Sequence, residues 1–144
     1  MRWRHDVVDS IRTDGPWMAE TDISAYFDFV KHELLLPELI TLGADPSIID
    51  RLREMLRVWG ITPNTGLPQG PNASRLLGNF YLNPVDAAMD QHPGIRYFRY
   101  MDDIRIVGSS RATVIAALQT LISECRRRGL ALSTACLLYT SRCV

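Results

Sequence analysis

Three aspartates from two separate stretches of the sequence are the residues best suited to chemistry. Asp22 ends a β-prone run, and Asp102 and Asp103 stand side by side much later in the chain. Carboxylates gathered within a few ångströms repel one another strongly, and they stay ionised only where a cation offsets their charge. Ligands that are all oxygen favour a hard ion such as Mg2+. If the fold brings the three together, they predict a divalent-metal site.

The elements that must position these aspartates are short strands. Residues 16–23, 95–100 and 104–107 are β-prone runs of the length typical of strands. Residues 101–103 join the second run to the third, which predicts a hairpin with both later carboxylates at or near its tip. Acid pairs seldom occupy such a position for the sake of stability, so a functional role is favoured.

Apolar residues at helical spacing predict helices between and after these strands. One helix follows Asp45-Pro46, an N-cap with proline at the first helical position, and ends at Gly60. Its apolar positions are Ile48, Leu52, Met55 and Trp59. A second helix is predicted from Pro71 to about Met89. A third is capped by Ser110, and its buried stripe would contain Val114, Ala117, Leu118, Leu121, Ile122 and Cys125.

The order of the predicted elements indicates the fold class. Residues 130–133 are predicted as a last strand, and Arg126–Arg128 before them as a solvated helix end that complements the helix dipole. Strand, helices, strand, strand, helix, strand is the split βαβ (ferredoxin-like) order of an α+β fold, with helices on one face of an antiparallel sheet. If the strands pair centrally, Asp22 and the hairpin carboxylates converge on one edge of that sheet.

Composition limits the other possibilities. The 144 residues, 47% of them hydrophobic, suit one globular domain, and a formal net charge of zero means that any contact with nucleic acid must be local. No signal peptide and no run of membrane-spanning length is present, so we predict a cytoplasmic protein without a membrane partner. Three cysteines without CxxC spacing predict neither a zinc site nor a disulfide framework.

Three motifs, in order, resemble the palm of reverse transcriptases. They are TDISAYFDFV from Thr21 to Val30, GLPQGPNASRLLGNFYLNPVD from Gly66 to Asp86, and RYMDDIRIVG from Arg99 to Gly108. The third contains the sequence YMDD, which is similar to the family's YxDD box. A lone pair of aspartates would be a weak signal, whereas three ordered motifs are specific. The resemblance implies an α+β polymerase palm and RNA-templated DNA synthesis by two-metal nucleotidyl transfer.

The resemblance also implies the metal ligands. Asp22 and Asp102 would be the principal catalytic ligands of two Mg2+ ions, with Mn2+ as a possible substitute, and Asp103 would be auxiliary. The backbone carbonyl of Ile23 would be a further ligand. Two such ions can activate a 3′-hydroxyl group and stabilise the departing pyrophosphate.

The resemblance also implies which residues bind the substrates. The resemblance implies that the ring of Phe27 lies under the incoming sugar and excludes a ribose 2′-hydroxyl group. Gln69 and Gly70 would line the pocket for the nucleotide and template, and Tyr100 and Met101 would complete the substrate-binding set. The implied partners are an RNA template, a DNA or RNA primer and deoxynucleoside triphosphates, and an associated non-coding RNA stays open.

Alternatives remain at this point. The motifs look more like bacterial chains, such as retron or phage-defence enzymes, than retroviral ones, and a group II intron maturase also fits. A non-catalytic nucleic-acid-binding or structural remnant is one different function. An RNA-dependent RNA polymerase is another, although that class resembles a pattern with aspartate at the position of Phe27 and GDD in the third motif.

The ends of the chain depart from the family pattern. Residues 1–135 are predicted as a partial palm without fingers and thumb, which we expect to be inactive alone. Gly129-Leu130-Ala131-Leu132 is similar to the family's GLxL segment, but Cys136 stands where a lysine is expected. Residues 136–144, CLLYTSRCV, look like a translated sequencing adapter, and we predict that this tail is not native.

Overall fold

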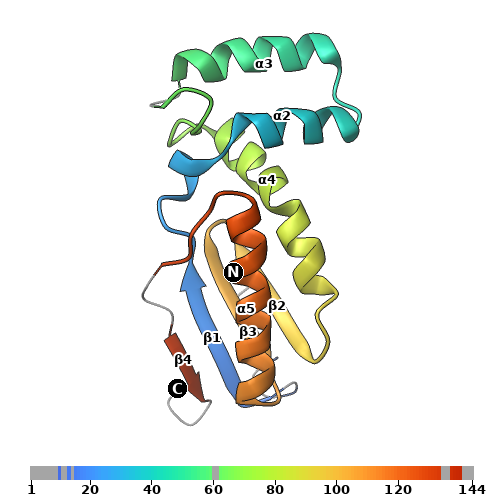
Figure 1. The fold of residues 1–144 in the computed structure, drawn as a ribbon, viewed down its shortest axis with the longest axis vertical. Helices are drawn as coiled ribbons and strands as arrows, with labels where there is room; N and C mark the ends of the chain where they lie inside the picture. The colour runs from blue at the N-terminus through green and yellow to red at the C-terminus, as the bar shows by residue number, and fades with distance from the viewer. Residues whose placement is uncertain (1–9, 11–12, 14, 60–61, 134–136, 141–144) are drawn as a thin grey trace. The chain divides into compact units, whose positions relative to one another are not determined.

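The computed structural model describes residues 10, 13, 15–59, 62–133 and 137–140. Its elements are the strands β1 (Trp17–Asp22), β2 (Ile95–Tyr100), β3 (Asp103–Gly108) and β4 (Leu137–Thr140), the 3-10 helix η1 (Tyr26–Phe29), and the helices α2 (His32–Thr41), α3 (Pro46–Trp59), α4 (Asn72–Asp90) and α5 (Arg111–Arg127) (Figure 1). They fall into two compact units. The first unit contains the chain up to Ser24, Pro84–Arg127 and the chain from Ala131 onward, and the second contains Ala25–Asn83 and Arg128–Leu130.

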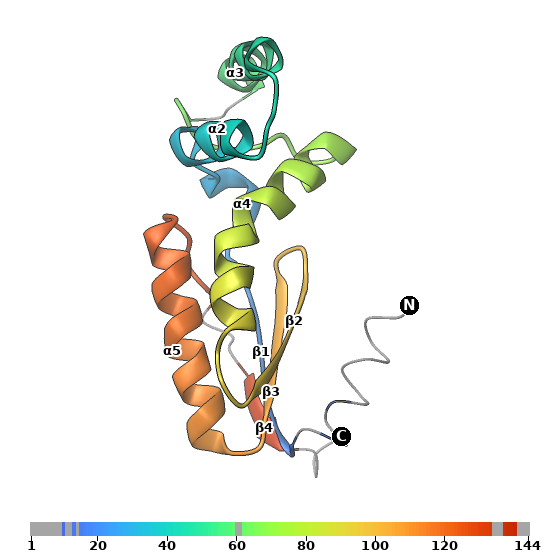
Figure 2. The same cartoon turned by 90° about the vertical axis from the view of Figure 1, so that its right-hand side faces the viewer.

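A four-stranded sheet forms the centre of the first unit. The strand order is β2-β3-β1-β4, and each neighbouring pair is antiparallel. Helix α5 packs against β1, β2 and β3, and Figure 2 shows α5 and the last turns of α4 on the same side of the sheet. This arrangement confirms the predicted α+β fold with an antiparallel sheet and helices on one face.

Helix α5 forms where the sequence predicts it. The Ser110 hydroxyl accepts a hydrogen bond from the backbone N–H of Thr113 at 3.1 Å, as expected of an N-cap. Its buried side chains are Val114, Ala117, Leu121 and Cys125, spaced three or four residues apart. That spacing makes one apolar face, which packs on the sheet.

In the second unit, α2 packs against α3, and the predicted cap of α3 is present. The Asp45 carboxylate accepts a hydrogen bond from the backbone N–H of Ser47 at 2.8 Å. The buried face of α3 differs from the predicted stripe, because Ile49 and Leu56 are buried. Ile48, Met55 and Trp59 are 61%, 45% and 44% exposed. Both sets recur at helical spacing, so the period alone does not select the face that meets α2.

The predicted last strand at residues 130–133 is wrong. Within this segment Leu132 forms only an isolated bridge with Ile23. The strand that extends the sheet beside β1 is β4 instead. The identity of an edge strand depends on which distant segment reaches β1, and local β-propensity does not encode that choice.

The prediction of a solvated arginine cluster holds for Arg126 and Arg127 but is wrong for Arg128, which is buried. The guanidinium group of Arg128 makes two 2.7 Å hydrogen bonds with the Glu38 carboxylate. It also lies 4.1 Å from the centre of the Tyr81 ring. Arg128 therefore contributes to the interior of the second unit, where a paired and stacked guanidinium can be tolerated.

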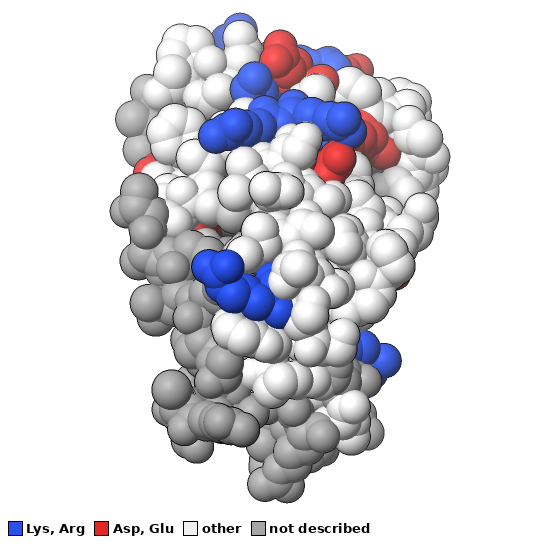
Figure 3. Space-filling view, turned by 60° about the horizontal axis from the view of Figure 1, so that its bottom comes forward, with Lys and Arg blue, Asp and Glu red and all other residues white. Residues whose placement is uncertain are grey.

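The face of the molecule drawn in Figure 3 agrees with the balanced charge of the sequence. On the face drawn in Figure 3, the Lys and Arg side chains of the described residues lie in separate patches rather than in one basic surface. Within the same residues, every helix is too short or too polar to cross a membrane. Any contact with nucleic acid on this face would therefore depend on local groups.

Candidate active site

Asp22 and Asp103 lie directly opposite each other in the sheet of the first unit. Asp22 is the last residue of β1 and Asp103 is the first residue of β3, and the antiparallel register pairs the two. Opposed residues of such a pair point to the same face, with Cβ atoms about 5 Å apart. Asp22 is exposed and Asp103 is half-buried. Two acids from distant parts of the chain thus meet at one end of the sheet.

Asp102 occupies the turn that joins β2 to β3. The backbone N–H of Ile23 donates a hydrogen bond to the carbonyl oxygen of Asp102 at 3.1 Å. Met101, in the same turn, has a positive φ of 58°, which places it in the left-handed region. The hydrogen bond ties the turn to the residue that follows Asp22, so all three aspartates belong to the same end of the sheet.

The electrostatics of this end are set by several charged side chains on one face. Burial raises the pKa of Asp103, Arg105 acts against this shift, and the nearby carboxylates of Glu20, Asp102 and Asp22 reinforce it. Arg105 forms an ion pair with Glu20 at 2.5 Å and a longer one with Asp103 at 3.7 Å. The protonated form of Asp103 is therefore favoured relative to an isolated aspartate, as expected where negative charge is incompletely compensated.

The donor atoms at this end fit a hard divalent cation in type, because they are carboxylate and backbone oxygens. As the side chains are oriented, however, the described residues contain no group of three His, Cys, Asp or Glu close enough to hold a metal ion. A bound ion would have to draw the carboxylates closer together. The nearby carboxylates of Glu20, Asp102 and Asp22, which add to the effect of burial in raising the pKa of Asp103, would be offset by added positive charge.

The second unit brings together the residues predicted for the nucleotide. Phe27 lies in η1, and its carbonyl oxygen accepts a hydrogen bond from the N–H of Leu67 at 2.8 Å. The Gln69 amide donates to the Asp28 carboxylate at 3.5 Å. Gly70 follows with a φ of 109°, a conformation that favours glycine. The loop with Gln69 and Gly70 is thus held against η1.

A cavity of about 380 Å³ lies beside this loop in the second unit. Its lining includes Gln69 and Asp28 together with Phe29 and Trp59. Sequence reasoning did not assign either of these aromatic residues to a site. Trp59 had been placed on the apolar face of its helix, and only the observed exposure of that face shows that it is available to line a cavity.

Of the remaining predicted residues, Tyr100 is 58% exposed and Met101 is half-buried in the hairpin turn.

Glu20 and Arg105 were not predicted from the sequence to be parts of the acidic end of the sheet. Strand alternation was the signal that could have found them, because residues two apart on a strand share a face. Glu20 is thereby on the face of Asp22, and Arg105 is on the face of Asp103.

An antiparallel sheet with helices on one face and aspartates at the paired strand ends is the arrangement expected of the palm class of template-directed polymerases. The chain belongs to the reverse transcriptase (RNA-dependent DNA polymerase) family, whose sequence model matches residues 3–136. This match confirms the family that the three motifs resemble. At the level of the family, the activity is RNA-dependent DNA synthesis.

Individual relatives match a little over half of the chain. The chain is 33% identical over 86 residues to protein YkfC of Escherichia coli K12, covering 56% of this chain and 23% of that protein. It is 34% identical over 91 residues to an uncharacterized 91 kDa protein in a cob intron of Schizosaccharomyces pombe, covering 57% of this chain and 11% of that protein. The chain therefore matches less than a quarter of the length of either relative.

Solved structures share the fold. Apo telomerase from Candida tropicalis superposes with a TM-score of 0.71 at 13% identity, over 99% of this chain and 33% of that one. Telomerase from Candida albicans, in complex with a TWJ fragment of telomeric RNA, has a TM-score of 0.67 at 11% identity, over 93% of this chain and 30% of that one. At these identities the likeness concerns the fold alone.

Proposed function

We propose that this chain is the catalytic palm of a reverse transcriptase and that residues 1–135 form that palm. Asp22 and Asp102 would be the principal metal ligands, with Asp103 auxiliary and the carbonyl of Ile23 as a further ligand. The observation that carries the proposal is the register that pairs Asp22 with Asp103 across β1 and β3. Membership of the reverse transcriptase family supports the assignment of the reaction.

The protein's own contribution to this reaction would be a set of oxygen donors whose backbones are fixed at one end of a sheet. Asp22 and Asp103 lie on paired strands, so the ladder of backbone hydrogen bonds fixes the separation of their Cα atoms, while their side chains can rotate toward a bound ion. Two Mg2+ ions, or Mn2+ in their place, would activate the primer 3′-hydroxyl group and stabilise the departing pyrophosphate. Arg105 limits the repulsion among the carboxylates through its pairs with Glu20 and Asp103.

Selection of the nucleotide would belong to η1 and the loop beside it. Phe27 would reject a ribose 2′-hydroxyl group, and Gln69 and Gly70 would contact the nucleotide and the template. Tyr100 and Met101 would complete the substrate-binding set. The proposed partners are an RNA template, a DNA or RNA primer and deoxynucleoside triphosphates. Membership of the reverse transcriptase (RNA-dependent DNA polymerase) family supports an RNA template.

Primer extension on an RNA template tests the catalytic roles. Because the chain spans a third or less of the two Candida telomerases to which it is similar, the assay uses the longest polypeptide that its gene encodes. Asp102→Ala should lower incorporation at least about a hundredfold, since a lost metal ligand removes several kcal/mol of transition-state stabilisation. Asp90→Ala is the matched control, because Asp90 is an exposed carboxylate at the end of α4.

The two alternatives give different results in the same assay. Equal incorporation by the Asp102→Ala variant and the unsubstituted protein would remove the catalytic assignment and favour a nucleic-acid-binding remnant. Equal use of ribonucleotides and deoxynucleotides by the unsubstituted protein would instead favour an RNA-dependent RNA polymerase.

A further inference from the structure

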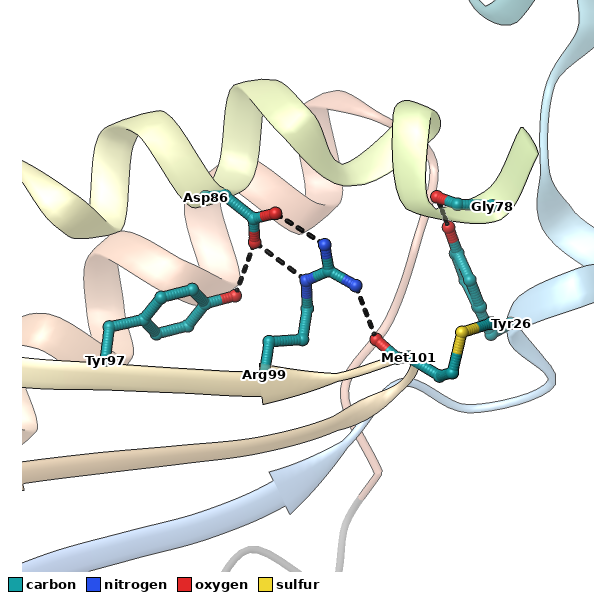
Figure 4. A network of polar contacts seen from close by, with 6 residues as sticks. All are labelled: Tyr26, Gly78, Asp86, Tyr97, Arg99 and Met101. Atoms are coloured by element: carbon teal, nitrogen blue, oxygen red, sulfur yellow. Dashed lines mark hydrogen bonds and ion pairs between the residues drawn. The ribbon is translucent and has the colours of Figure 1, made fainter. Parts of the chain in front are cut away.

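A network of polar contacts in the first unit connects helix α4 to the turn that carries Asp102 (Figure 4). Arg99, near the end of β2, donates from Nε to the Asp86 carboxylate at 2.7 Å and makes a second bond to the other oxygen of that carboxylate. Its remaining terminal nitrogen donates to the carbonyl oxygen of Met101 at 3.0 Å. Tyr97 donates its hydroxyl to Asp86 at 3.0 Å. One guanidinium group thus joins a helix carboxylate to a turn carbonyl.

The burial of this network makes its geometry specific. The Arg99 side chain is 10% exposed and that of Asp86 is 26% exposed. A two-pronged pair between arginine and a carboxylate fixes the orientation of the guanidinium plane, and charge-assisted bonds of this kind are stronger than neutral ones. Arg99 is therefore held in the orientation that directs its last nitrogen to Met101.

The turn needs such a support, because Met101 adopts the left-handed conformation with a φ of 58°. A residue with a side chain reaches this region at an energetic cost and stays there when its surroundings fix it. The carbonyl of Met101 is held by Arg99, and the carbonyl of Asp102 is held by the N–H of Ile23. The peptide groups on both sides of the Asp102 Cα atom are therefore fixed.

We propose that Asp86 and Arg99 are a positioning pair that sets the backbone of the Asp102 turn and, through it, the metal affinity of the acidic end. This inference rests on the proposed metal site. Neither residue would touch the metal or the substrate, since Arg99 acts on the Met101 carbonyl and Asp86 acts on Arg99. The pair resembles an outer shell of a metal site, where a lost partner weakens metal binding by about ten- to a hundredfold.

The test compares Arg99→Lys with Tyr97→Phe in the full 144-residue chain. Lysine keeps the positive charge, but its single ammonium group cannot reproduce the flat three-way contact of arginine. Tyr97→Phe removes one hydrogen bond to the same carboxylate and leaves the contact between Arg99 and Met101 in place. Circular dichroism melting first establishes how far each variant is destabilised.

The first readout is hydrogen exchange of the Ile23 amide, which requires no metal. Because this N–H donates to the Asp102 carbonyl, its protection reports the position of the turn. Each variant is measured the same number of degrees below its own melting temperature. Under this condition we expect the Ile23 amide to exchange about tenfold faster in Arg99→Lys than in Tyr97→Phe. Equal protection in the two variants would overturn the positioning role.

The second readout is Mn2+ binding, followed by the loss of the free-ion electron paramagnetic resonance signal. We expect Arg99→Lys to bind Mn2+ about tenfold more weakly than the unsubstituted chain, and Tyr97→Phe to bind it equally well. Equal affinity in Arg99→Lys and the unsubstituted chain would contradict the positioning pair while leaving the metal site intact. If Asp102→Asn binds Mn2+ as tightly as the unsubstituted chain, the proposed metal site itself fails, and the exchange experiment still decides the role of Arg99 in the turn.

Discussion

Asp103 connects stability to pH at the level of a single residue. Its pKa is raised by burial and by the neighbouring carboxylates, so the folded chain binds this proton more tightly than the unfolded chain does. Ionising Asp103 therefore opposes folding. That cost is absent below the pKa of the unfolded chain, near 3.9, grows as the pH rises through the folded value, and persists at neutral pH.

Asp103→Asn should accordingly raise the melting temperature at pH 7.5, by about 2 °C, and change it less at pH 4. Asparagine has nearly the same shape as aspartate but is uncharged, so the substitution removes the cost of ionising residue 103 in the folded chain. Thermal melts in metal-free buffer at both pH values measure the difference, with the exposed Asp90→Asn as control. An equal rise at both pH values would contradict the electrostatic origin of the effect.

Phe27 makes a second prediction at the residue scale. If its ring excludes the 2′-hydroxyl group, Phe27→Ala should lower the preference for deoxynucleotides over ribonucleotides by about tenfold or more while DNA synthesis continues. The ratio of kcat/KM for the two kinds of nucleotide measures this preference in the full gene product. An unchanged ratio would remove Phe27 from nucleotide selection.

At the scale of elements, Gly78 in α4 is the point where the helix and η1 come close within the second unit. A Cβ atom at this position would lie 3.2 Å from the ring of Tyr26 and 3.4 Å from the ring of Phe27. The Tyr26 hydroxyl also donates a hydrogen bond to the carbonyl oxygen of Gly78. The glycine therefore sets how near the two aromatic rings lie to the helix.

Gly78→Ala should displace these rings by a few tenths of an ångström. Alanine favours the helix by up to about 1 kcal/mol, which opposes the cost of the close contacts, so we expect a small net change in stability. The effect should appear instead in nucleotide selection, with a lower preference for deoxynucleotides. The kcat/KM ratio measures it, and an unchanged ratio together with unchanged Phe27 chemical shifts would contradict the close approach.

The elements that the sequence predicted well are those specified by nearby residues. Helix α5 has a cap at Ser110 and a single apolar stripe, and the β2–β3 hairpin joins two adjacent β-prone runs. Features that depend on distant partners were predicted poorly. The buried face of α3 is one of two apolar faces, and the edge of β1 is paired by β4 rather than by residues 130–133.

The same distinction between local and distant determinants applies to the candidate site. The aspartates could be found from residue type and motif order, and strand pairing then places Asp22 opposite Asp103. The link from Asp86 through Arg99 to Met101 could not be found in this way, because it joins a helix to a hairpin turn through one side chain. The predicted roles of the aspartates as metal ligands stay predictions, and the proposed adapter origin of residues 136–144 stays one as well.

At the scale of the whole molecule, this chain spans a third or less of the Candida telomerase structures to which it is similar. Catalysis of this kind depends on holding primer, template and nucleotide in register, and a misplacement of about 1 Å can cost a hundredfold in rate. We therefore expect the 144-residue chain alone to extend a primer at least about a hundredfold more slowly than the longest product of its gene. Equal rates would show that the palm alone positions the substrates.

The most direct measurement of the central claim is anomalous X-ray diffraction from crystals of this chain soaked in MnCl2. The account predicts Mn2+ peaks between the carboxylates of Asp22 and Asp102, with Asp103 adjacent, and their loss in Asp102→Asn crystals. Clear Mn2+ peaks elsewhere in the molecule, with none at this end of the sheet, would contradict it.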